Sequence, residues 1–453
     1  MLYQIDGSKK YRQFQIPKKN GGTRDIKAPI ERLALLQSRL AELLSSCVGE
    51  LEVINPRRWV AAHGFYPGRT IVSNAVLHRS KRYVFNVDLE NFFGTINFGR
   101  VRGYFIKDRG FELSPSVATI LAQIACHENA LPQGSPCSPM ISNLVGNILD
   151  ARLLAFAKQN RCIYSRYADD LTFSTNEKLF PNAIAVNVQG SEWIVGTQLQ
   201  DIISRSGFTL NNNKTRMSLR IARQTVTGLV VNKKVNVPRE YYRTVRAMCS
   251  HLFRTGSYHR KGNVASPPPE EMTDISSLEG MLSHIHFVRS RQDRSAEINK
   301  LAEGAGEWEY PKASAELYRR FLFYKHFVAI NAPLIVPEGI SDIVYLQCAI
   351  RCLASAFPAL AETKSGAVPK ISVKFLRATS RTRELMNLSH GAAGQANLIA
   401  NYSNMLRKYH VPKLVHPVII LCDNDEGPKT VFKNAAKKTT KSISLSIPTP
   451  RAA

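Results

Sequence analysis

Short alternating runs of apolar and polar residues, interspersed with segments whose apolar residues recur at helical spacing, fill residues 1–238 and predict an α+β core. Residues 239–330 read mainly as helix and contain a polar insert, 255–275, whose three consecutive prolines exclude regular helix there. Residues 331–453 open with a strand-like Leu-Ile-Val run and predict a smaller α/β domain. The pattern therefore indicates three parts.

Two of the predicted strands lead into acidic residues. One alternating apolar and polar segment ends in Asp88, as a strand does when it presents a carboxylate at a sheet edge. Residues 161–175 form two β-prone runs around Asp169 and Asp170, which predicts a hairpin with adjacent acids at its tip. Between these segments, the turn-rich loop 131–139 opens a predicted helix with an apolar stripe.

This arrangement of acids suits phosphoryl transfer. Two divalent ions about 4 Å apart activate a hydroxyl nucleophile and stabilise the leaving pyrophosphate. Such ions need hard oxygen ligands, here from separate chain segments. A lone pair of aspartates in a turn is most often an ordinary solvated loop. The additional strand-borne acid and the intervening Gln-Gly loop favour a metal site formed by Asp88, Asp169 and Asp170.

Charge and cysteine usage narrow the class of protein. The formal net charge is +26 and basic residues predominate on both sides of residue 330, so nucleic acid is the expected partner and a membrane surface the weaker alternative. We find neither a leader sequence nor an apolar run of spanning length. The eight cysteines lack disulfide or zinc spacing. We therefore expect a cytoplasmic protein with reduced, mostly buried thiols.

Around these acids the sequence resembles the reverse transcriptase family. Tyr167–Asp170 matches its YxDD motif, Asp88 with the following Phe-Phe matches its first catalytic motif, and Leu131–Gly134 matches the loop beside the incoming nucleotide. The resemblance implies a right-hand polymerase with fingers, palm and helical thumb that copies RNA into DNA from dNTPs. It implies two Mg²⁺ ions, held by the three catalytic aspartates. Nucleotide contacts would come from Arg24, Phe93 (which would exclude a ribose 2′-OH), Gln133 and Lys214.

Two further elements resemble the retron branch of that family. Asn74–His78 matches its NAxxH element and Val226–Gly228 its VTG element. The resemblance implies a structured non-coding RNA as template and a guanosine 2′-OH as primer, so that the product is a branched RNA–DNA molecule (msDNA). It also implies a role in antiphage defence together with an effector. A histidine after an apolar pair is more often structural, and we assign His78 no acid–base role. The RNA-binding residues so implied are Asn74, His78, Val226, Thr227 and Gly228.

Residues 331–453 resemble a Toprim domain, whose pattern is a Glu-Gly element followed by a strand with alternating acids. Glu338 follows the first strand-like run, and Asp423 and Asp425 follow a later one. Parallel strands of an open α/β sheet place their ligands at their carboxyl ends, so these acids would share Mg²⁺. The resemblance implies a fused nuclease effector with Glu338 as a catalytic residue and the two aspartates as metal ligands. Few residues follow Asp425, so we expect an incomplete domain.

Two other interpretations stay open. Another bacterial reverse transcriptase class, of the group II intron or diversity-generating type, would keep the polymerase chemistry without the branched primer. The Asn74–His78 element argues against that class. A non-catalytic nucleic-acid-binding scaffold would use its metal sites only structurally, and the intact set of acids argues against it. The sequence leaves open the oligomeric state, a homo-oligomer included, and whether the chain is truncated at either end.

Overall fold

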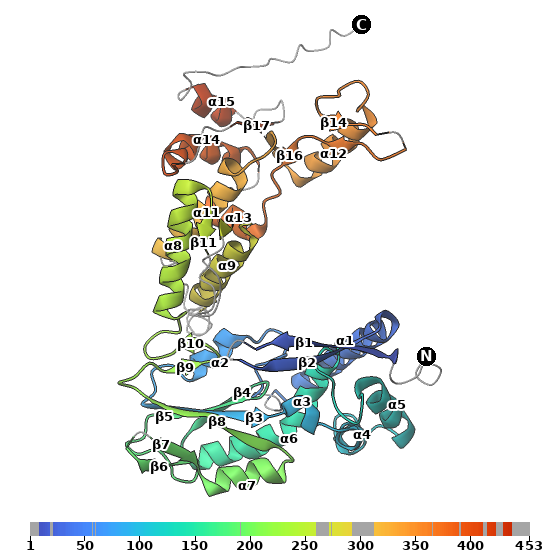
Figure 1. Ribbon diagram of the computed structural model, residues 1–453, viewed down its shortest axis with the longest axis vertical. Coiled ribbons are helices and arrows are strands. Elements are labelled where there is room, and N and C mark those ends of the chain that lie inside the picture. The colour runs from blue at the N-terminus through green and yellow to red at the C-terminus, as the bar shows by residue number, and fades with distance from the viewer. Residues whose placement is uncertain are drawn as a thin grey trace. The chain divides into compact units, whose positions relative to one another are not determined.

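A computed structural model describes most of the chain. The described residues are 9–18, 21–56, 58, 60–190, 192–259, 271–272, 274–291, 312–364, 366–388, 391–410, 415–422 and 429–436. The chain divides into two compact units (Figure 1). The first comprises Met1–Pro238 and Arg291–Glu303, and the second comprises Arg239–Ser290 and Gly304–Ala453.

A four-stranded antiparallel sheet with the strand order β4-β5-β3-β8 organises the first unit (Figure 1). Phe85 pairs with Phe173 and Val87 with Leu171 across the two central strands, and none of these side chains is more than 1% exposed. The predicted acid-bearing strand and the predicted hairpin are therefore confirmed. The strands are β3 (Tyr83–Glu90), β4 (Ile163–Tyr167), β5 (Asp170–Thr175) and β8 (Thr209–Leu219).

Helix α6 (Ser138–Gln159) packs against β4 and supplies much of the core. Its predicted apolar stripe is buried at Ile141, Leu144 and Leu149, whereas Ile148 is 46% exposed. Among the described residues, α6 is the one helix long and apolar enough to cross a membrane, which corrects our expectation that no apolar run reaches that length. Its most apolar stretch is 67% buried inside the protein, as in the core helix of a globular domain.

The first unit begins with the hairpin of β1 (Tyr11–Pro17) and β2 (Thr23–Pro29), which precedes the long helix α1 (Glu31–Ile54). Gln37 of α1 is fully buried and donates a hydrogen bond of 2.8 Å to the hydroxyl of Tyr11, which ties the hairpin to the helix. The other elements of this unit are α2 (Ile71–Leu77), α3 (Phe92–Thr95), α4 (Phe98–Lys107), α5 (Pro115–Ala125), β6 (Ala185–Gln189), β7 (Glu192–Val195), α7 (Thr197–Arg205), β9 (Thr225–Val226) and β10 (Leu229–Val230).

A buried polar network joins α2 to the β4–β5 hairpin. His78 caps the end of α2 and its two ring nitrogens lie 2.7 Å from the hydroxyls of Ser165 and Ser174. Ser165 donates its own hydrogen to Asn74 Oδ1 at 2.6 Å. Nε2 of His78 must therefore carry the ring proton and donate to Ser165, while Nδ1 accepts from Ser174. Burial lowers the pKa of His78 to about 3 and keeps the imidazole neutral.

The second unit begins with helical elements, as predicted for the described part of residues 239–330. They are α8 (Arg239–Thr255), α9 (Ser276–Arg291), α11 (Lys312–Phe323) and the π-helical turn η3 (Tyr324–Val328). Within the predicted insert, β11 (Tyr258–His259) pairs with β12 (Glu271–Met272), and residues 260–270 and 273 lie outside the described residues.

Aromatic side chains pack across the boundary that we predicted near residue 330. The ring centroid of Tyr409 lies 5.3 Å from that of Phe253 and 5.9 Å from that of Phe323. Tyr402 lies 5.6 Å from Phe323, and the backbone N–H of His410 donates to the carbonyl of Phe253 at 3.0 Å. Burial of these rings stabilises α8 and α11 together with the C-terminal residues, and all of them belong to the second unit.

The C-terminal part contains a parallel three-stranded sheet with the order β16-β13-β17, which agrees with the α/β prediction. Its strands are β13 (Leu334–Val336), β16 (Lys374–Phe375) and β17 (Val418–Ile420). The accompanying elements are α12 (Ile340–Cys352), β14 (Ala361–Glu362), β15 (Lys370–Ile371), α13 (Ser380–Met386), α14 (Ala392–Leu406) and α15 (Lys429–Ala436).

The cysteines of α12 correct the expectation of mostly buried thiols. Cys348 and Cys352 are exposed, and α12 instead buries Ile343 and Ile350. Three other cysteines are buried and all eight are free. The cysteines are free, as expected for reduced thiols. The face of α12 that packs inward, however, is not the face that carries Cys348 and Cys352.

We predict that His78→Ala destabilises the first unit by about 2–4 kcal/mol, because it opens a cavity and leaves two buried hydroxyls without their partner. Folding lowers the pKa of His78 from 6.5 to about 3, so the wild type loses stability as the pH falls below 6.5. The difference in the free energy of unfolding between wild type and variant should therefore become smaller as the pH falls from 7.5 to 5. Urea unfolding at both pH values measures this difference. Leu77→Ala is the control, because that side chain is 38% exposed and does not titrate.

Candidate active site

The register of the sheet gathers the three predicted catalytic acids at one place. Asp88 of β3 pairs with Asp170, the first residue of β5, and on its other side with Asn211 of β8. The backbone N–H of Leu89 donates to the carbonyl of Asp169 at 3.0 Å. Asp88 is only 5% exposed. Acids from two distant segments of the chain thus become neighbours through strand pairing.

A tight turn presents Asp169. Because Tyr167 pairs with Asp170, Ala168 and Asp169 form a two-residue loop between β4 and β5. Ala168 adopts a φ of 56°, which the first central residue of a type II′ turn requires. Gly64 packs directly on this turn, since a Cβ at that position would lie 2.6 Å from the backbone nitrogen of Ala168. The close approach requires glycine there.

Two of the acids resist ionisation. Burial, the Asp169 carboxylate and the Asp88 carboxylate raise the pKa of Asp170 to about 6. Burial also raises the pKa of Asp169, and Asp88 adds to that effect while Lys214 opposes it. Crowded carboxylates of this kind are stabilised by a nearby cation.

Lys214 supplies one such cation. Its Nζ on β8 lies 2.9 Å from Oδ1 and 3.0 Å from Oδ2 of Asp88. The pairing with Asp88 raises the pKa of Lys214, and the ammonium therefore stays charged. Lys214 was predicted to face the site, and its side chain does so.

The chemistry of these residues fits a divalent ion, although they do not form a ready-made cage. Among the described residues, no three acidic, histidine or cysteine side chains are arranged so that they could hold a metal ion. Both oxygens of Asp88 bind Lys214 instead. The donors are nevertheless hard carboxylate oxygens, and burial together with the neighbouring carboxylates raises the pKa values of Asp169 and Asp170. A bound ion would compete with the Lys214 ammonium for Asp88.

The predicted nucleotide-binding loop lies against the β1–β2 hairpin. The carbonyl of Gln133 accepts a hydrogen bond of 2.7 Å from the backbone nitrogen of Lys27 on β2. Gly134 has a φ of 118°, and a Cβ there would lie 3.0 Å from the Lys27 carbonyl, so the loop needs glycine to approach β2. Arg24 is exposed on the same strand, and its positive charge partly offsets the rise in the pKa of Asp169 that burial causes. Arg24 is therefore near enough to Asp169 for its charge to act on that carboxylate.

Phe93 follows the acid-bearing strand on the short helix α3. Its ring centroid lies 5.5 Å from that of Phe92 and 6.2 Å from that of Phe65, and the side chain is half-buried. Asn91 begins this turn with a φ of 46°, which redirects the chain directly after the strand. Phe93 is therefore fixed by aromatic contacts close to the strand that carries Asp88.

Comparison with known proteins assigns this arrangement to a family. The model of the family described as reverse transcriptase (RNA-dependent DNA polymerase) matches residues 16–247. The retron Ec86 reverse transcriptase of Escherichia coli is 32% identical over 255 residues, which cover 55% of this chain and 70% of that protein. The retron Ec83 reverse transcriptase of the same species is 30% identical over 310 residues, covering 66% and 87%. This chain belongs to the retron reverse transcriptase family.

Other members of the family are longer than the matched region. The retron Mx162 reverse transcriptase of Myxococcus xanthus is 32% identical over 325 residues, which cover 67% of this chain and 63% of that protein. The chain spans 62% of the retron Mx65 reverse transcriptase from the same organism. A solved telomerase structure from Candida albicans aligns with a TM-score of 0.39 at 9% identity, over 74% of this chain and 66% of that chain, which is too weak a likeness to add to the assignment.

The retron-specific elements lie largely inside the protein. Asn74 is 1% exposed, and His78 and Val226 are fully buried, so these side chains offer no surface to RNA. This corrects the expectation that all three contact RNA directly, because their burial supports the fold instead. Thr227 and Gly228 form a two-residue turn with φ values of 46° and 78°, and this turn is the accessible part of the element.

The C-terminal acids are described only in part. Glu338 follows β13, and its Oε1 accepts a hydrogen bond of 3.1 Å from the backbone nitrogen of Ala392 at the start of α14. The backbone nitrogen of Leu421 donates to the carbonyl of Val336 at 3.0 Å, so the carboxyl ends of β13 and β17 meet. Asp423 and Asp425 lie outside the described residues.

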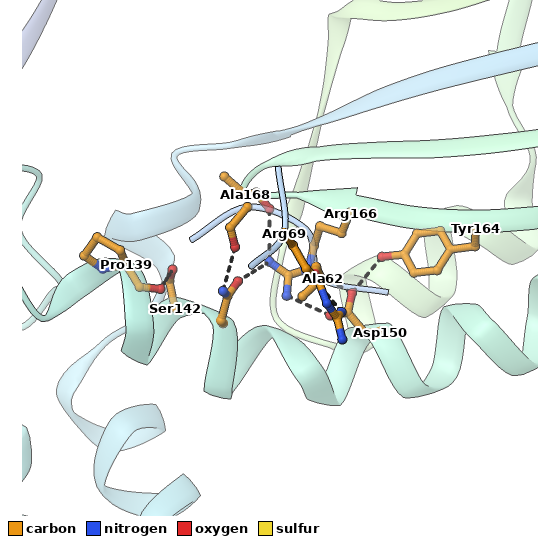
Figure 2. Close-up of polar contacts among 10 residues, drawn as sticks. Ala62, Arg69, Pro139, Ser142, Asp150, Tyr164, Arg166 and Ala168 are labelled. Atoms are coloured by element: carbon orange, nitrogen blue, oxygen red, sulfur yellow. Dashed lines mark hydrogen bonds and ion pairs between the residues drawn. The ribbon is translucent and has the colours of Figure 1, made fainter. Parts of the chain in front are cut away.

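Sequence reasoning missed one pair of charged residues beneath the catalytic turn. Arg166 of β4 and Asp150 of α6 are both almost completely buried and form an ion pair (Figure 2). The signal was available, because an arginine at an inward-facing position of a strand must have a buried acidic partner. The sequence gives no indication of which acid that is.

We predict that Lys214→Ala tightens the binding of Mn²⁺ to the nucleotide-free protein several-fold, because the ammonium no longer competes for the Asp88 carboxylate. Titration followed by electron paramagnetic resonance measures the free Mn²⁺. Lys233→Ala, which removes an equal charge from the exposed surface of the same unit, should leave the affinity unchanged. Equal or weaker binding in the Lys214 variant would contradict competition between the lysine and the metal.

Proposed function

We propose that this chain is the RNA-directed DNA polymerase of a retron, which makes branched RNA–DNA from a structured non-coding RNA. The observation that carries the proposal is the strand register that gathers Asp88, Asp169 and Asp170 at one end of the two central strands, in a chain that belongs to this family. The net charge of +26 supports a nucleic-acid partner. Site and partner point to the same activity.

In the proposed reaction a primer hydroxyl attacks the α-phosphate of a dNTP, the new O–P bond forms, and the bond to pyrophosphate breaks. Two Mg²⁺ ions, when bound, would acidify the hydroxyl and offset the charge on the leaving group. Asp88, Asp169 and Asp170 would hold them. Lys214 and Arg24 supply positive charge beside the acids, and a guanidinium pairs well with phosphate oxygens. Their task would be to orient the triphosphate.

The choice of sugar is proposed to depend on Phe93. The family resemblance gives this position the role of a wall below the 2′ carbon of the incoming nucleotide. Contacts with Phe92 and Phe65 hold the ring in one place, as a steric gate requires. Gln133 would contact the same nucleotide from the loop that lies against β2.

Template and primer follow from the retron family. The structured RNA would serve as template, and a guanosine 2′-OH within it as the primer. The Thr227-Gly228 turn is the accessible part of the retron-specific elements and is the proposed RNA contact there. The exposed arginines of α8, among them Arg243 and Arg246, would hold RNA by its phosphates, since A-form RNA is recognised mainly by shape and backbone.

We further propose that the C-terminal part is a Toprim-type nuclease that acts as the effector in antiphage defence. In its parallel sheet, β13 lies in the middle and is followed by Glu338, while β17 beside it runs toward Asp423 and Asp425 in the sequence. Acids after neighbouring parallel strands lie at the same sheet edge and can share Mg²⁺. Arg377 and Arg383 line the cavity next to Glu338 and would suit a phosphodiester substrate.

Asp169→Asn should lower DNA synthesis by several orders of magnitude, because the amide keeps the shape of the side chain but cannot anchor a cation. RNA binding should persist, since it depends on the basic surface. Primer extension on an RNA template and a filter-binding assay measure the two properties. Asp201→Asn on the exposed side of α7 is the matched control. Near-normal extension by the pure Asp169 variant would refute the polymerase assignment.

Glu338→Gln and the double change Asp423→Ala/Asp425→Ala should each abolish Mg²⁺-dependent cleavage of DNA or RNA by the full chain. DNA synthesis should be unchanged, because the two sets of acids belong to different units and share no ligand, and changes at sites without shared partners are close to additive. Glu362→Gln, an exposed glutamate of the same part, is the control. Cleavage that survives both changes, or a wild type that cleaves neither nucleic acid, would contradict the nuclease proposal.

A further inference from the structure

The ion pair of Arg166 and Asp150 lies inside the first unit, between the catalytic hairpin and α6. The Arg166 side chain is 0% exposed and that of Asp150 1%. Two parallel hydrogen bonds join them, from Nε to Oδ1 at 2.8 Å and from Nη2 to Oδ2 at 2.7 Å. The hydroxyl of Tyr164 donates to the same Oδ1 at 2.8 Å. The carboxylate is thus held by three donors and fixes the plane of the guanidinium.

The third nitrogen of this guanidinium reaches the catalytic turn. Nη1 of Arg166 donates to the carbonyl of Ala168 at 3.2 Å (Figure 2). The same nitrogen donates to Asn143 Oδ1 at 3.3 Å. Asn143 in turn donates from Nδ2 to the carbonyl of Gly64 at 2.7 Å. Gly64 is the residue that packs on the backbone nitrogen of Ala168. One network therefore holds the turn at two points, through the carbonyl of Ala168 and through Gly64, which packs on the Ala168 nitrogen.

Stability alone does not account for such a pair. A buried ion pair often contributes no more than well-packed apolar side chains of the same volume, because both charges must be desolvated. What arginine adds is geometry, since its rigid fork places several donors at fixed positions. The fold makes room for this fork at Gly146, where a Cβ would lie 3.0 Å from Arg166 Cζ. The space is shaped for the guanidinium.

We infer that Arg166, oriented by Asp150, is a positioning residue for the polymerase site. By holding the carbonyl of Ala168 it fixes the backbone immediately before Asp169, and so the place of the Asp169 carboxylate relative to Asp88. The acids then meet metal ions in a preset geometry. This inference rests on the proposed polymerase function, because it assigns the network to the metal site of that reaction. Misplacement of a catalytic group by about 1 Å can cost roughly 100-fold in rate.

The test removes the two charges together, so that neither is left buried alone. In the full chain, Arg166→Met/Asp150→Leu keeps the approximate volume and deletes the contact with Ala168. Arg58→Met/Asp108→Leu is the matched control, because that partly buried ion pair in the same unit joins elements that do not carry the acids. Thermal unfolding, template-primer affinity and the Mg²⁺ dependence of single-nucleotide incorporation are measured for each.

We expect the Arg166/Asp150 variant to fold and to bind template-primer as the wild type does. Its kcat should fall about 10- to 100-fold, and the Mg²⁺ concentration for half-maximal rate should rise several-fold. The control pair should change the unfolding temperature alone. A folded Arg166/Asp150 variant with wild-type kcat and wild-type Mg²⁺ dependence would overturn the inference.

Two further measurements test the inference even if the double variant does not fold or the wild type does not polymerise. Arg166→Lys retains the charge but lacks the fork, so it should show the same raised Mg²⁺ requirement; normal Mg²⁺ dependence in this variant would overturn the inference even if the double variant fails to fold. If the wild type polymerises nothing, the proposed function fails. Mn²⁺ affinity measured by electron paramagnetic resonance then decides, because weaker binding by Arg166→Lys supports positioning and equal binding refutes it.

Discussion

The crowding of three carboxylates at one end of the central strand pair is the constraint on which the rest of the first unit depends. The pairing of Asp88 with Asp170 places like charges side by side in a partly buried position, and the raised pKa of Asp170 reflects the cost. The structure opposes this repulsion with cations. Lys214 binds Asp88, and the positive charge of Arg24 opposes the rise in the pKa of Asp169. These opposing charges let the acids stay together before a metal ion arrives.

Local pattern predicted the parts of this site, and pairing between distant segments decided the rest. Alternation and turn chemistry were enough to locate the strand ending in Asp88 and the hairpin that presents Asp169. The partner of Arg166 could not be predicted, because Asp150 sits on a helix and nothing local links the two. His78 was expected to help hold RNA, yet its burial between two serine hydroxyls shows that a motif residue can serve the fold. Asp423 and Asp425 stay predictions.

In the second unit, buried side chains pack across the boundary that the sequence pattern predicts. The strand-like Leu-Ile-Val run after residue 331 suggested that a separate α/β domain begins near residue 330. Aromatic rings at Phe253, Phe323, Tyr402 and Tyr409 instead pack the thumb helices against C-terminal residues. Such a shared core means that the proposed polymerase thumb and the proposed effector are joined by more than a linker. Changes in one have a physical route to the other, which domains joined only by a flexible chain would lack.

The central claim is that Asp88, Asp169 and Asp170 form one metal site for templated DNA synthesis. Anomalous X-ray scattering from crystals of the full chain with Mn²⁺, an RNA template-primer and a non-hydrolysable dNTP tests it most directly. The account predicts two anomalous peaks about 4 Å apart that contact the carboxylates of Asp88 and the catalytic turn, with the Lys214 ammonium displaced from Asp88. Peaks that avoid Asp88, with its ion pair to Lys214 still intact in the ternary complex, would contradict it.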